Sequence, residues 1–508
     1  MAAFDTSAPL LPEIFSLHGK WKDNKPALVC ENRIVSWRQF EANTNRIANA
    51  LISRGVSRGK MVGVVMSNGI AMVEVLVAVM KSGACSVPIN LSVSDEALEA
   101  MLKDADVNAV FCTTDQQARL QPYLTAQSSV LAVSDEELAD FSKAASTCLP
   151  SVGLEDNDPL NVIYSSGTTG MPKGILHTHQ GRRDWAYDLA IALRYHSAAR
   201  TLFSIGLYSN ISWVGMLCTL LSGGTMVIAP RFEAHETLQT IQDQGITHFA
   251  MVPIQYQRLM EVPDQDAFDL STIEAVMSCG SPLHADLKKT LFQRLGPRAV
   301  IELFGLTEGV ITTLDPEEAE GRMASVGKPL IGTDIRIIGD DDKEVPNGQS
   351  GEIVGCGRIV MPGYLNRPDA TAEATWTDAN GKAWLRTGDI GQLDEQGYLY
   401  IVDRKKDMIL SGGQNIYPQD IEAVLIKHEA VNEVAVIGIP SARWGETPLA
   451  IVVPEPGKTI DEAALVDWAN AQLGRQQRIS GVAQTDALPR NANGKILKRE
   501  LREIYGGN

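Results

Sequence analysis

Hydrophobic and polar residues alternate along the first half of the chain with the spacings of helices and strands. Apolar positions on one helical face predict a helix over residues 36–55, and a more uniformly apolar segment predicts a second helix over residues 69–83. Short apolar runs at residues 61–66 and 107–112 predict buried strands. Because strands and helices alternate at this spacing, the sequence predicts parallel α/β sheets.

The pattern changes near residue 350, where short β-like runs are separated by turns rich in Gly, Asp and Asn. Such runs at residues 351–354, 397–402 and 434–439 predict strands. A charged stretch that begins at Asp403 leads into a pair of glycines, and we expect a domain boundary there. We therefore predict a large N-terminal domain, residues 1–402, and a small C-terminal domain of mixed α/β pattern, residues 403–508.

Composition and charge exclude several classes of protein. The 508 residues carry a formal net charge of −17 without a strongly basic block, which argues against nucleic acid or an anionic membrane as the main partner. No apolar run reaches the roughly 18–20 residues of a membrane span, and the N-terminal segment lacks the features of a secretory signal. Seven scattered cysteines without a CxxC pair indicate free thiols rather than a disulfide framework or a zinc site. Together these features predict a cytoplasmic protein with no membrane span.

The stretch YSSGTTGMPKG, residues 164–174, carries the clearest chemical signal. Backbone N–H groups, hydroxyls and a lysine gathered in one loop can cradle a polyphosphate, whereas a flexible turn is the alternative interpretation of such a loop. The Walker A pattern is absent, and the residues that follow predict a strand rather than a helix, which disfavours a P-loop ATPase. The candidate phosphate-binding residues are Ser165, Ser166, Gly167, Thr168, Thr169 and Lys173.

Five motifs, in order, resemble the signatures of the adenylate-forming superfamily: acyl- and aryl-CoA ligases, adenylation domains and beetle luciferases. They are the loop at 164–174, ELFGLTE at 302–308, TGD at 387–389, DRKKDMILSGGQNIYP at 403–418 and PRNANGK at 489–495. The resemblance covers essentially the whole chain and is closest to acyl- or aryl-CoA ligases. It implies an α/β fold, with a large N-terminal domain of stacked α/β sheets plus a β-barrel-like part and a small mobile C-terminal α+β domain. It also implies ATP, Mg²⁺ and coenzyme A, with a small carboxylic acid as the substrate.

The resemblance assigns nucleotide-binding roles to single residues. Glu308 matches the family glutamate that ligates Mg²⁺, and Thr307 matches the residue that hydrogen-bonds the α-phosphate. Phe304 takes the place of an aromatic residue, often Tyr, that stacks on adenine. Asp389 would accept hydrogen bonds from both ribose hydroxyls, and Arg404 would help to hold the ribose.

The catalytic lysine of the family matches Lys495, whose positive charge can bridge the carboxylate of the acid and the α-phosphate. Lys495 lies far along the chain from the phosphate loop, so the two domains must close for the reaction. Asp403 matches the hinge for a second closure in which a thiol attacks. Gly412 and Gly413 match the loop that then faces the active site, where a pantetheine arm passes close to backbone.

The acid pocket departs most from the family pattern. Many relatives carry an aromatic–His pair at positions that fall, by length, on Tyr208 and Ser209, so the histidine is missing and its role in this chain is open. The large side chains in this stretch argue against a long straight alkyl chain. The candidate pocket residues are Tyr208, Ser209, Asn210, Trp213, Gly280 and Gly305.

The acyl acceptor has two candidates. Trp444 and Arg478 resemble positions near the CoA nucleotide in aryl-CoA ligases, which favours CoA, although a core aromatic and a surface ion-pair residue are the alternative interpretations. The leading hypothesis is an AMP-forming acid–CoA ligase. The alternatives are a stand-alone adenylation enzyme that loads a carrier protein, a degenerate nucleotide-binding protein, and a luciferase-like oxygenase. The identity of the acid and the oligomeric state are open.

Overall fold

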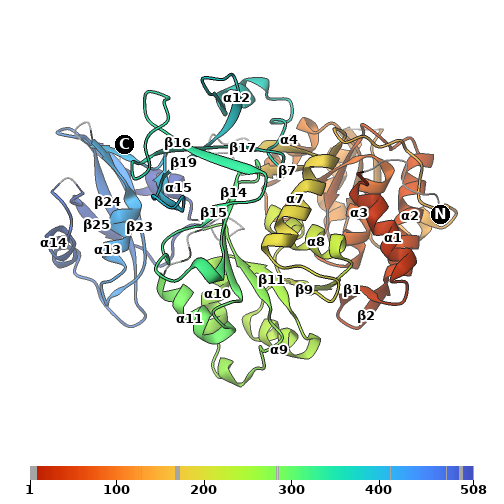
Figure 1. Cartoon of the computed structure of the whole chain (residues 1–508), viewed down its shortest axis with the longest axis horizontal. Coiled ribbons are helices and arrows are strands. Elements are labelled where there is room, and N and C mark those ends of the chain that lie inside the picture. The colour runs from red at the N-terminus through yellow and green to blue at the C-terminus, as the bar shows by residue number, and fades with distance from the viewer. Residues whose placement is uncertain are drawn as a thin grey trace. The chain divides into compact units, whose positions relative to one another are not determined.

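The computed structural model describes residues 8–126, 129–165, 172–281, 283, 285–411, 414–475, 477–490 and 496–506. The chain forms two compact units (Figure 1). The first comprises Met1–Ala324, Pro329–Asp334 and Cys356–Thr375, and the second comprises Ser325–Lys328, Ile335–Gly355 and Trp376–Asn508. In the described part of the chain, no helix is both long and apolar enough to cross a membrane.

A six-stranded sheet in the first unit leads into the Ser/Thr/Gly loop. Its strands are β3 (Met61–Val65), β4 (Cys85–Pro88), β5 (Val107–Cys112), β6 (Leu131–Ser134), β7 (Pro159–Ser165) and β8 (Lys173–Thr178). The order is β6-β5-β3-β4-β7-β8, and every neighbouring pair is parallel except β7 and β8, which are antiparallel. The sheet therefore ends in a β7–β8 hairpin on an otherwise parallel framework.

A nine-stranded sheet supplies the other strand ends near the candidate site. Its strands are β1 (Pro26–Cys30), β2 (Arg33–Ser36), β9 (Arg200–Phe203), β10 (Thr225–Ile228), β11 (His248–Met251), β12 (Ala275–Ser278), β13 (Val300–Gly305), β14 (Ile311–Leu314) and β15 (Lys328–Pro329). The order is β15-β14-β13-β12-β11-β9-β10-β1-β2, with parallel pairing from β13 to β1. Because parallel strands share one carboxyl edge, the residues that follow β9, β11, β12 and β13 gather there, where α/β sheets bind ligands.

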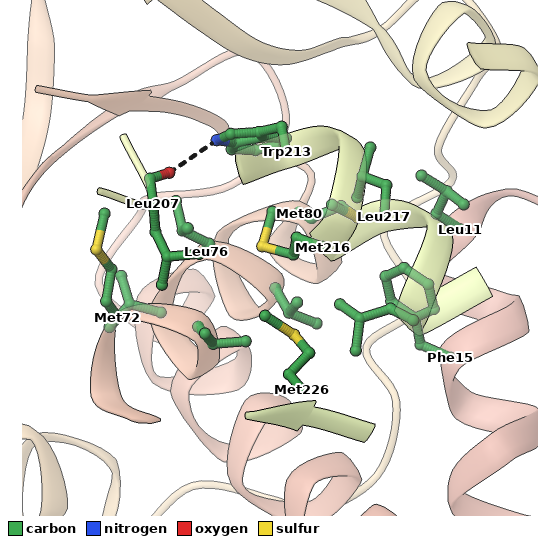
Figure 2. Close-up of a cluster of buried hydrophobic side chains, with 14 of the residues drawn as sticks. Leu11, Phe15, Met72, Leu76, Met80, Leu207, Trp213, Met216, Leu217 and Met226 are labelled. Atoms are coloured by element: carbon green, nitrogen blue, oxygen red, sulfur yellow. Dashed lines mark hydrogen bonds between the residues drawn. The ribbon is translucent and has the colours of Figure 1, made fainter. Parts of the chain in front are cut away.

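Helices cover these sheets, and two of them are apolar nearly all round. The helices of the first unit are α1 (Leu11–Trp21), α2 (Trp37–Ser53), α3 (Ile70–Ser82), α4 (Asp95–Asp104), α5 (Gln117–Ala126), α6 (Leu138–Ser142), α7 (His179–Ala192), α8 (Asn210–Ser222), α9 (Ala234–Gln244), α10 (Pro253–Met260), α11 (Ala285–Leu295) and α12 (Pro368–Glu373). Figure 2 shows Leu76 and Met80 of α3 beside Met216 and Leu217 of α8 in the main core. A helix surrounded by protein needs no polar face, which explains the composition of α3 and α8.

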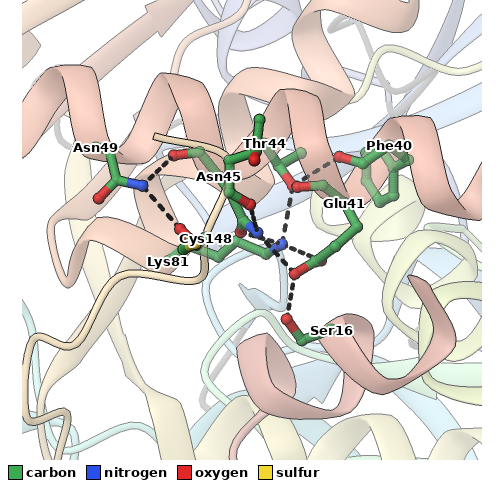
Figure 3. Close-up of polar contacts among 9 residues, drawn as sticks. Ser16, Phe40, Glu41, Thr44, Asn45, Asn49, Lys81 and Cys148 are labelled. Atoms are coloured by element: carbon green, nitrogen blue, oxygen red, sulfur yellow. Dashed lines mark hydrogen bonds and ion pairs between the residues drawn. The ribbon is translucent and has the colours of Figure 1, made fainter. Parts of the chain in front are cut away.

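A buried lysine, Lys81 near the end of α3, is held by a polar network (Figure 3). Its side chain is 1% exposed and forms an ion pair with Glu41 of α2. Lys81 Nζ also donates to Thr44 Oγ1 at 2.9 Å and to Asn45 Oδ1 at 2.9 Å. Ser16 of α1 donates to the same Glu41 carboxylate, so the charge pair joins three helices. Burial of an ammonium is tolerated here because a carboxylate and further acceptors surround it.

The second unit contains two five-stranded sheets. One has the order β16-β17-β19-β18, with β20 paired to β19. Its strands are β16 (Thr333–Ile338), β17 (Gly351–Gly357), β18 (Thr375–Thr377), β19 (Ala383–Leu393) and β20 (Leu399–Arg404). The other has the order β22-β21-β24-β23, with β25 paired to β24; its strands are β21 (Ile409–Ser411), β22 (Gln414–Ile416), β23 (Val431–Ser441), β24 (Gly445–Pro454) and β25 (Gly481–Gln484). Helices α13 (Pro418–Leu425), α14 (Glu462–Gln472) and α15 (Lys498–Tyr505) cover that sheet with apolar side chains.

The local sequence predictions are confirmed. The predicted helix over residues 36–55 is α2, where Ser36 Oγ accepts from the Gln39 backbone N–H at 3.3 Å, and the helix over 69–83 is α3, which ends at Gly83 with a positive φ. The runs at 61–66 and 107–112 are β3 and β5, and the mixed α/β class with large and small parts is observed. The division of the chain at residue 403 concerns relative motion and stays a prediction, because the compact units are defined by packing alone.

Candidate functional site

The Ser/Thr/Gly loop connects two antiparallel strands whose ends are aligned. Ser165, the last residue of β7, pairs with Lys173, the first residue of β8. The candidate residues Ser166, Gly167, Thr168 and Thr169 lie outside the described residues. The described residues on either side of them, Ser165 and Lys173, are paired at the edge of the six-stranded sheet, and the strand predicted after the loop is β8.

Three residues from separate segments meet beside this hairpin. Lys173 Nζ lies 5.1 Å from the centre of the Tyr364 ring. The Tyr364 hydroxyl donates to Glu308 Oε1 at 2.9 Å. Burial, with Glu308 as a second cause, raises the pKa of Tyr364, so the phenol keeps its proton and remains a donor. The candidate phosphate lysine and the candidate metal ligand are thus joined through one tyrosine.

The backbone around Tyr364 fixes this arrangement. The Leu365 N–H donates to the Gly174 carbonyl at 2.8 Å, which holds the segment against β8. The Met361 N–H donates to the Glu308 carbonyl at 2.8 Å, which holds the same segment against the turn after β13. One short segment therefore sets the position of Glu308 relative to the hairpin.

Gly309, directly after Glu308, is required by this close packing. Its φ is +107°, a value that favours glycine. A Cβ at this position would lie 2.1 Å from the Ile359 carbonyl oxygen and 2.7 Å from Val360 Cα. Because backbone atoms cannot yield as a flexible side chain can, only glycine fits beside the candidate metal ligand.

The other candidate nucleotide residues of the first unit lie at the carboxyl end of β13. Phe304 and Thr307 are half-buried and Gly305 is exposed, so each is open to a ligand. Beneath them, Glu302 is buried and forms an ion pair with Lys288, whose charge partly offsets the rise in the pKa of Glu302 that burial causes. This buried pair supports the strand end that carries the candidate adenine and phosphate contacts.

Asp389 and Arg404 lie opposite each other on β19 and β20 of the second unit. Arg404 Nε is 3.0 Å from Asp389 Oδ1, and the Asp389 side chain is buried while Arg404 is 36% exposed. The Asp389 N–H donates to Thr387 Oγ1 at 3.1 Å, which fixes the turn that carries the carboxylate. The structure thus brings together the two residues predicted to hold the ribose.

Asp403, the predicted hinge residue, is buried at the end of β20. Its carboxylate accepts from the Arg404 N–H at 2.6 Å and from the Gln419 N–H, in the first turn of α13, at 3.0 Å. Burial is the main cause that raises the pKa of Asp403 to about 6, while Lys498 opposes the shift. The carboxylate therefore connects the end of one sheet to the first helix of the C-terminal part.

Three candidate residues of the second unit lie outside the described residues: Gly412, Gly413 and Lys495. The strands that flank the glycines pair with Ser411 opposite Gln414. The residues that flank the Lys495 segment pair as well, since Arg490 and Ile496 form an isolated bridge.

The two candidate CoA contacts are exposed side chains. Trp444 is 47% exposed and directly precedes β24, whose first residue, Gly445, pairs with Ser411. Arg478 is exposed and lies shortly before β25. Both side chains can therefore be reached by a ligand, and Trp444 is close in the fold to the residue that precedes the two glycines.

A small cavity lies at the carboxyl ends of β9 and β11, beside the first turns of α8. Its lining includes Ser204, Ile211, Gly215 and Ala250. The Ser204 hydroxyl is buried in this wall and has no hydrogen-bond partner among the described residues. Gly280 is close by, because a Cβ there would lie 3.4 Å from Ile211 Cδ1. The cavity has a volume of about 10 Å³, room for about one water molecule, and it lies beside the candidate acid-pocket residues near α8.

The candidate pocket residues near α8 take different positions. Tyr208 is half-buried and its ring lies against Gly206, while Ser209 caps α8 by accepting from the Ile211 N–H at 3.4 Å. Trp213 is fully buried, and its indole N–H donates to the Leu207 carbonyl at 3.1 Å (Figure 2). Ser209 therefore caps a helix at the position where the resemblance implied a histidine, and Trp213 lies in the core.

Sequence reasoning missed two residues that the structure brings to the site. Tyr364 contacts Glu308, which is 56 residues away along the chain, and Arg182 of α7 donates to Asn210, which is 28 residues away. No local pattern marks either residue. The sequence offers only weak signals: an aromatic residue after a glycine for Tyr364, and a pair of arginines shortly before an apolar stretch for Arg182.

The sequence matches two described families: residues 18–365 match the AMP-binding enzyme family and residues 420–495 match the AMP-binding enzyme C-terminal domain. A feruloyl-CoA synthase from Amycolatopsis sp. is 35% identical over 93% of this chain and 94% of that protein. A 2-succinylbenzoate–CoA ligase from Bacillus cereus is 32% identical over 95% and 96%. The solved structure of ATP-bound MatB from Rhodopseudomonas palustris is similar with a TM-score of 0.89, at 27% identity and over 97% and 99% of the two chains. The chain therefore belongs to the AMP-binding enzyme family, in its acyl- and aryl-CoA ligase branch of adenylate-forming enzymes.

Proposed function

We propose that this protein is an ATP-dependent acid–CoA ligase. In the first half-reaction a carboxylate attacks the α-phosphate of ATP, which gives an acyl-adenylate and releases pyrophosphate. In the second, the CoA thiol attacks the acyl carbon, which gives the thioester and releases AMP. CoA ligases similar over nearly the full length of the chain support the reaction type.

The observation that carries the proposal is the meeting of Lys173, Tyr364 and Glu308 beside the β7–β8 hairpin. A reaction between two anions needs cationic groups at the phosphates and a fixed position for each partner. Lys173 supplies a positive charge at the end of the loop, and Glu308 supplies a carboxylate at the same place. Both are held by a tyrosine whose backbone is bonded to β8.

Glu308 is the proposed ligand of Mg²⁺. A half-buried carboxylate that a phenol orients fits a hard cation that keeps several waters and takes its other ligands from phosphates. When bound, Mg²⁺ would neutralise phosphate charge as pyrophosphate leaves. Thr307, directly before Glu308, is the proposed donor to the α-phosphate.

The remaining nucleotide contacts are proposed from position and chemistry. Phe304 would stack on adenine at the end of β13. Asp389, oriented by Arg404, would accept the ribose hydroxyls. Ser165, with Ser166, Gly167, Thr168 and Thr169 of the loop, would hold the β- and γ-phosphates. Lys495 would bridge the acid carboxylate and the α-phosphate during the first half-reaction.

The second half-reaction is assigned to the C-terminal part of the chain. We place its hinge at Asp403, where a carboxylate links β20 to α13. Gly412 and Gly413 would border the path of the pantetheine arm, and Trp444 and Arg478 would contact the CoA nucleotide. A reaction that consumes ATP and CoA fits the cytoplasm, which is where we place the enzyme.

The proposal is tested by measuring pyrophosphate, AMP and ADP across short, branched, hydroxylated, fatty and aromatic acids, with and without CoA. Acid-dependent pyrophosphate and AMP, with acyl-CoA formed when CoA is present, is the expected result. ADP and phosphate would refute the adenylate mechanism. Thioester formation on a carrier protein and none on free CoA would refute CoA as the acceptor. Glu308→Gln serves as the matched control for background ATP hydrolysis.

A further inference from the structure

Four cationic side chains are buried among the described residues of the first unit, and one of them lacks the ion pair that the other three form. Three form ion pairs with carboxylates: Lys81 with Glu41, Lys288 with Glu302, and Arg183 with Asp184 and Asp156. Arg182 of α7 is 1% exposed and forms no ion pair with any described residue. A buried charge without a counter-charge is costly, so this exception in a protein that pairs its other buried cations calls for a physical reason.

Amides and aromatic rings surround the Arg182 guanidinium. Its Nε donates to Asn161 Oδ1 at 2.9 Å, and its Nη2 donates to Asn210 Oδ1 at 2.8 Å. The guanidinium carbon lies 4.5 Å from the Trp185 ring centre and 5.4 Å from that of Trp213. Burial lowers the pKa of Arg182 to about 9, which still leaves it charged at neutral pH. The rings and amide oxygens hold the cation without neutralising it.

The guanidinium also fixes which way both amides face. Arginine has five N–H donors and no acceptor, so each asparagine must turn its oxygen toward Arg182. Both Nδ2 groups are then left as donors. Asn161 Nδ2 is buried and has no partner among the described residues. Asn210 is half-buried, and its side-chain hydrogen bond to a described residue is the one that its Oδ1 accepts from Arg182. His177, opposite Asn161 on β8, is kept neutral by burial and by Arg182, and its Nε2 has no described partner.

This donor-rich cluster borders the candidate acid pocket. Asn210 is half-buried and is the first residue of α8. The next two residues, Ile211 and Ser212, line the cavity at the ends of β9 and β11. The positive end of the helix dipole of α8 points the same way and favours negative charge at its N-terminus. Positive charge and N–H groups that have no described acceptor therefore lie beside residues that line the cavity, and no carboxylate of a described residue forms an ion pair with Arg182.

We infer that Arg182 and Asn210 make this enzyme select acids that carry an oxygen acceptor away from the reacting carboxyl group, above all a second carboxylate. The inference rests on the proposed ligase function. Asn210 is the residue that would contact the distal oxygen through Nδ2. Arg182 is a positioning residue, because it turns the Asn210 amide and supplies the positive potential. An acid with an apolar end leaves these donors unsatisfied and is selected against.

The test compares paired acids with the same number of heavy atoms, one with an oxygen at the distal end and one with an apolar distal end. Adipate is compared with octanoate, and 4-hydroxycinnamate with 4-methylcinnamate, by the kcat/KM for pyrophosphate release. Asn210→Asp places a carboxylate beside Arg182 and preserves the fold by forming an ion pair, whereas Asn210→Leu removes the donor. Thr178→Ala is the control. Thr178 Oγ1 accepts from the Gly181 N–H at 3.0 Å and so caps α7, the helix that carries Arg182, but it makes no contact with the cluster in this bond.

We expect the wild-type protein to prefer the oxygen-bearing acid of each pair. Both Asn210 variants should lower that preference by at least about tenfold, which is the effect of losing one hydrogen bond to a charged or strongly polar group. Asn210→Asp should penalise adipate more than 4-hydroxycinnamate, since it adds negative charge, while Thr178→Ala should keep both ratios. Equal use of both acids by the wild type, or ratios in Asn210→Leu within twofold of wild type, would overturn the inference.

A binding readout separates this inference from the ligase proposal. The thermal midpoint of the wild-type protein should rise with adipate and not with octanoate, and Asn210→Asp should abolish the rise. If no acid supports pyrophosphate release, the ligase proposal fails, and the thermal shifts still decide whether the cluster binds a distal carboxylate. No difference between the two acids in that assay would overturn the cluster as a specificity element.

Discussion

Replacing Tyr364 with phenylalanine removes one hydrogen bond from the candidate site and little else. The ring stays over Lys173, and the backbone bonds of this segment to β8 and to Glu308 do not involve the hydroxyl. What is lost is the donation of the hydroxyl to Glu308 Oε1 at 2.9 Å. The experiment therefore isolates the orientation of the candidate Mg²⁺ ligand.

The size of the effect follows from the environment of this hydrogen bond. A bond to a charged acceptor contributes roughly 1.5–3 kcal/mol, and because both residues are only half-buried we take the lower end, about 1.5 kcal/mol, or about tenfold in rate. We expect kcat/KM for MgATP to fall about tenfold in Tyr364→Phe by this estimate and the half-saturating Mg²⁺ concentration to rise. Tyr364→Leu, which also loses the ring, should lose more.

The assay is acid-dependent pyrophosphate release, with MgATP and free Mg²⁺ titrated separately. The decisive comparison is a double-mutant cycle with Glu308→Gln, because the tyrosine is argued to act through that carboxylate. In the Glu308→Gln background, Tyr364→Phe should cause little further loss. Equal losses in both backgrounds, or an unchanged Mg²⁺ titration in the single variant, would refute the reasoning.

Three further predictions address other parts of the chain. Lys495→Ala should nearly abolish adenylate formation while sparing transfer from supplied acyl-adenylate to CoA; equal loss in both half-reactions, measured separately, would remove the lysine from the first step. Gly309→Ala should destabilise the fold by about 2–4 kcal/mol in urea unfolding, because it adds a backbone clash to the strain of a positive φ. Gly55→Ala, at φ +79° with open space around the Cβ, is its control and should cost only about 1 kcal/mol. The pKa of Asp403 is raised to about 6, so between pH 4 and 6 the folded protein keeps a proton that the unfolded chain has released. The free energy of unfolding should therefore fall by up to about 3 kcal/mol across this range and level off above pH 6. Urea unfolding across this range should show that fall in the wild type and a smaller fall in Asp403→Asn. The same dependence of unfolding free energy on pH in both proteins would contradict this assignment.

Local patterns in the sequence predict most of the framework and the order of the candidate motifs. The first turn of α2 is predictable because Ser36 and Gln39 are three residues apart and satisfy each other's backbone groups. The largely apolar segment over residues 69–83 can also be predicted as a buried helix. A helix that is buried on all sides has no polar face, so its sequence is apolar nearly throughout. Such features depend on contacts within one or two helical turns.

Other features depend on contacts between distant segments, and the sequence carries no periodic signal for them. The hydrogen bond from Tyr364 to Glu308 exists because the segment around residue 364 returns to lie on β8. Trp213, expected at the acid pocket, lies in the core because its indole N–H finds the Leu207 carbonyl there. An aromatic residue with a polar atom suits a pocket wall and a core equally well by composition, and only the three-dimensional surroundings distinguish the two.

The ion pair between Lys81 and Glu41 has a consequence for how this fold can change during evolution or in a mutational scan. Loss of either partner alone leaves a buried charge unpaired, at a cost of roughly 3–5 kcal/mol, while exchange of both for apolar residues of similar volume can be neutral or favourable. A scan of single substitutions would therefore score both positions as indispensable, although neither residue belongs to the candidate site. Related proteins are therefore expected to have both charges or neither. The pair tends to be retained because each single substitution that removes one charge is destabilising.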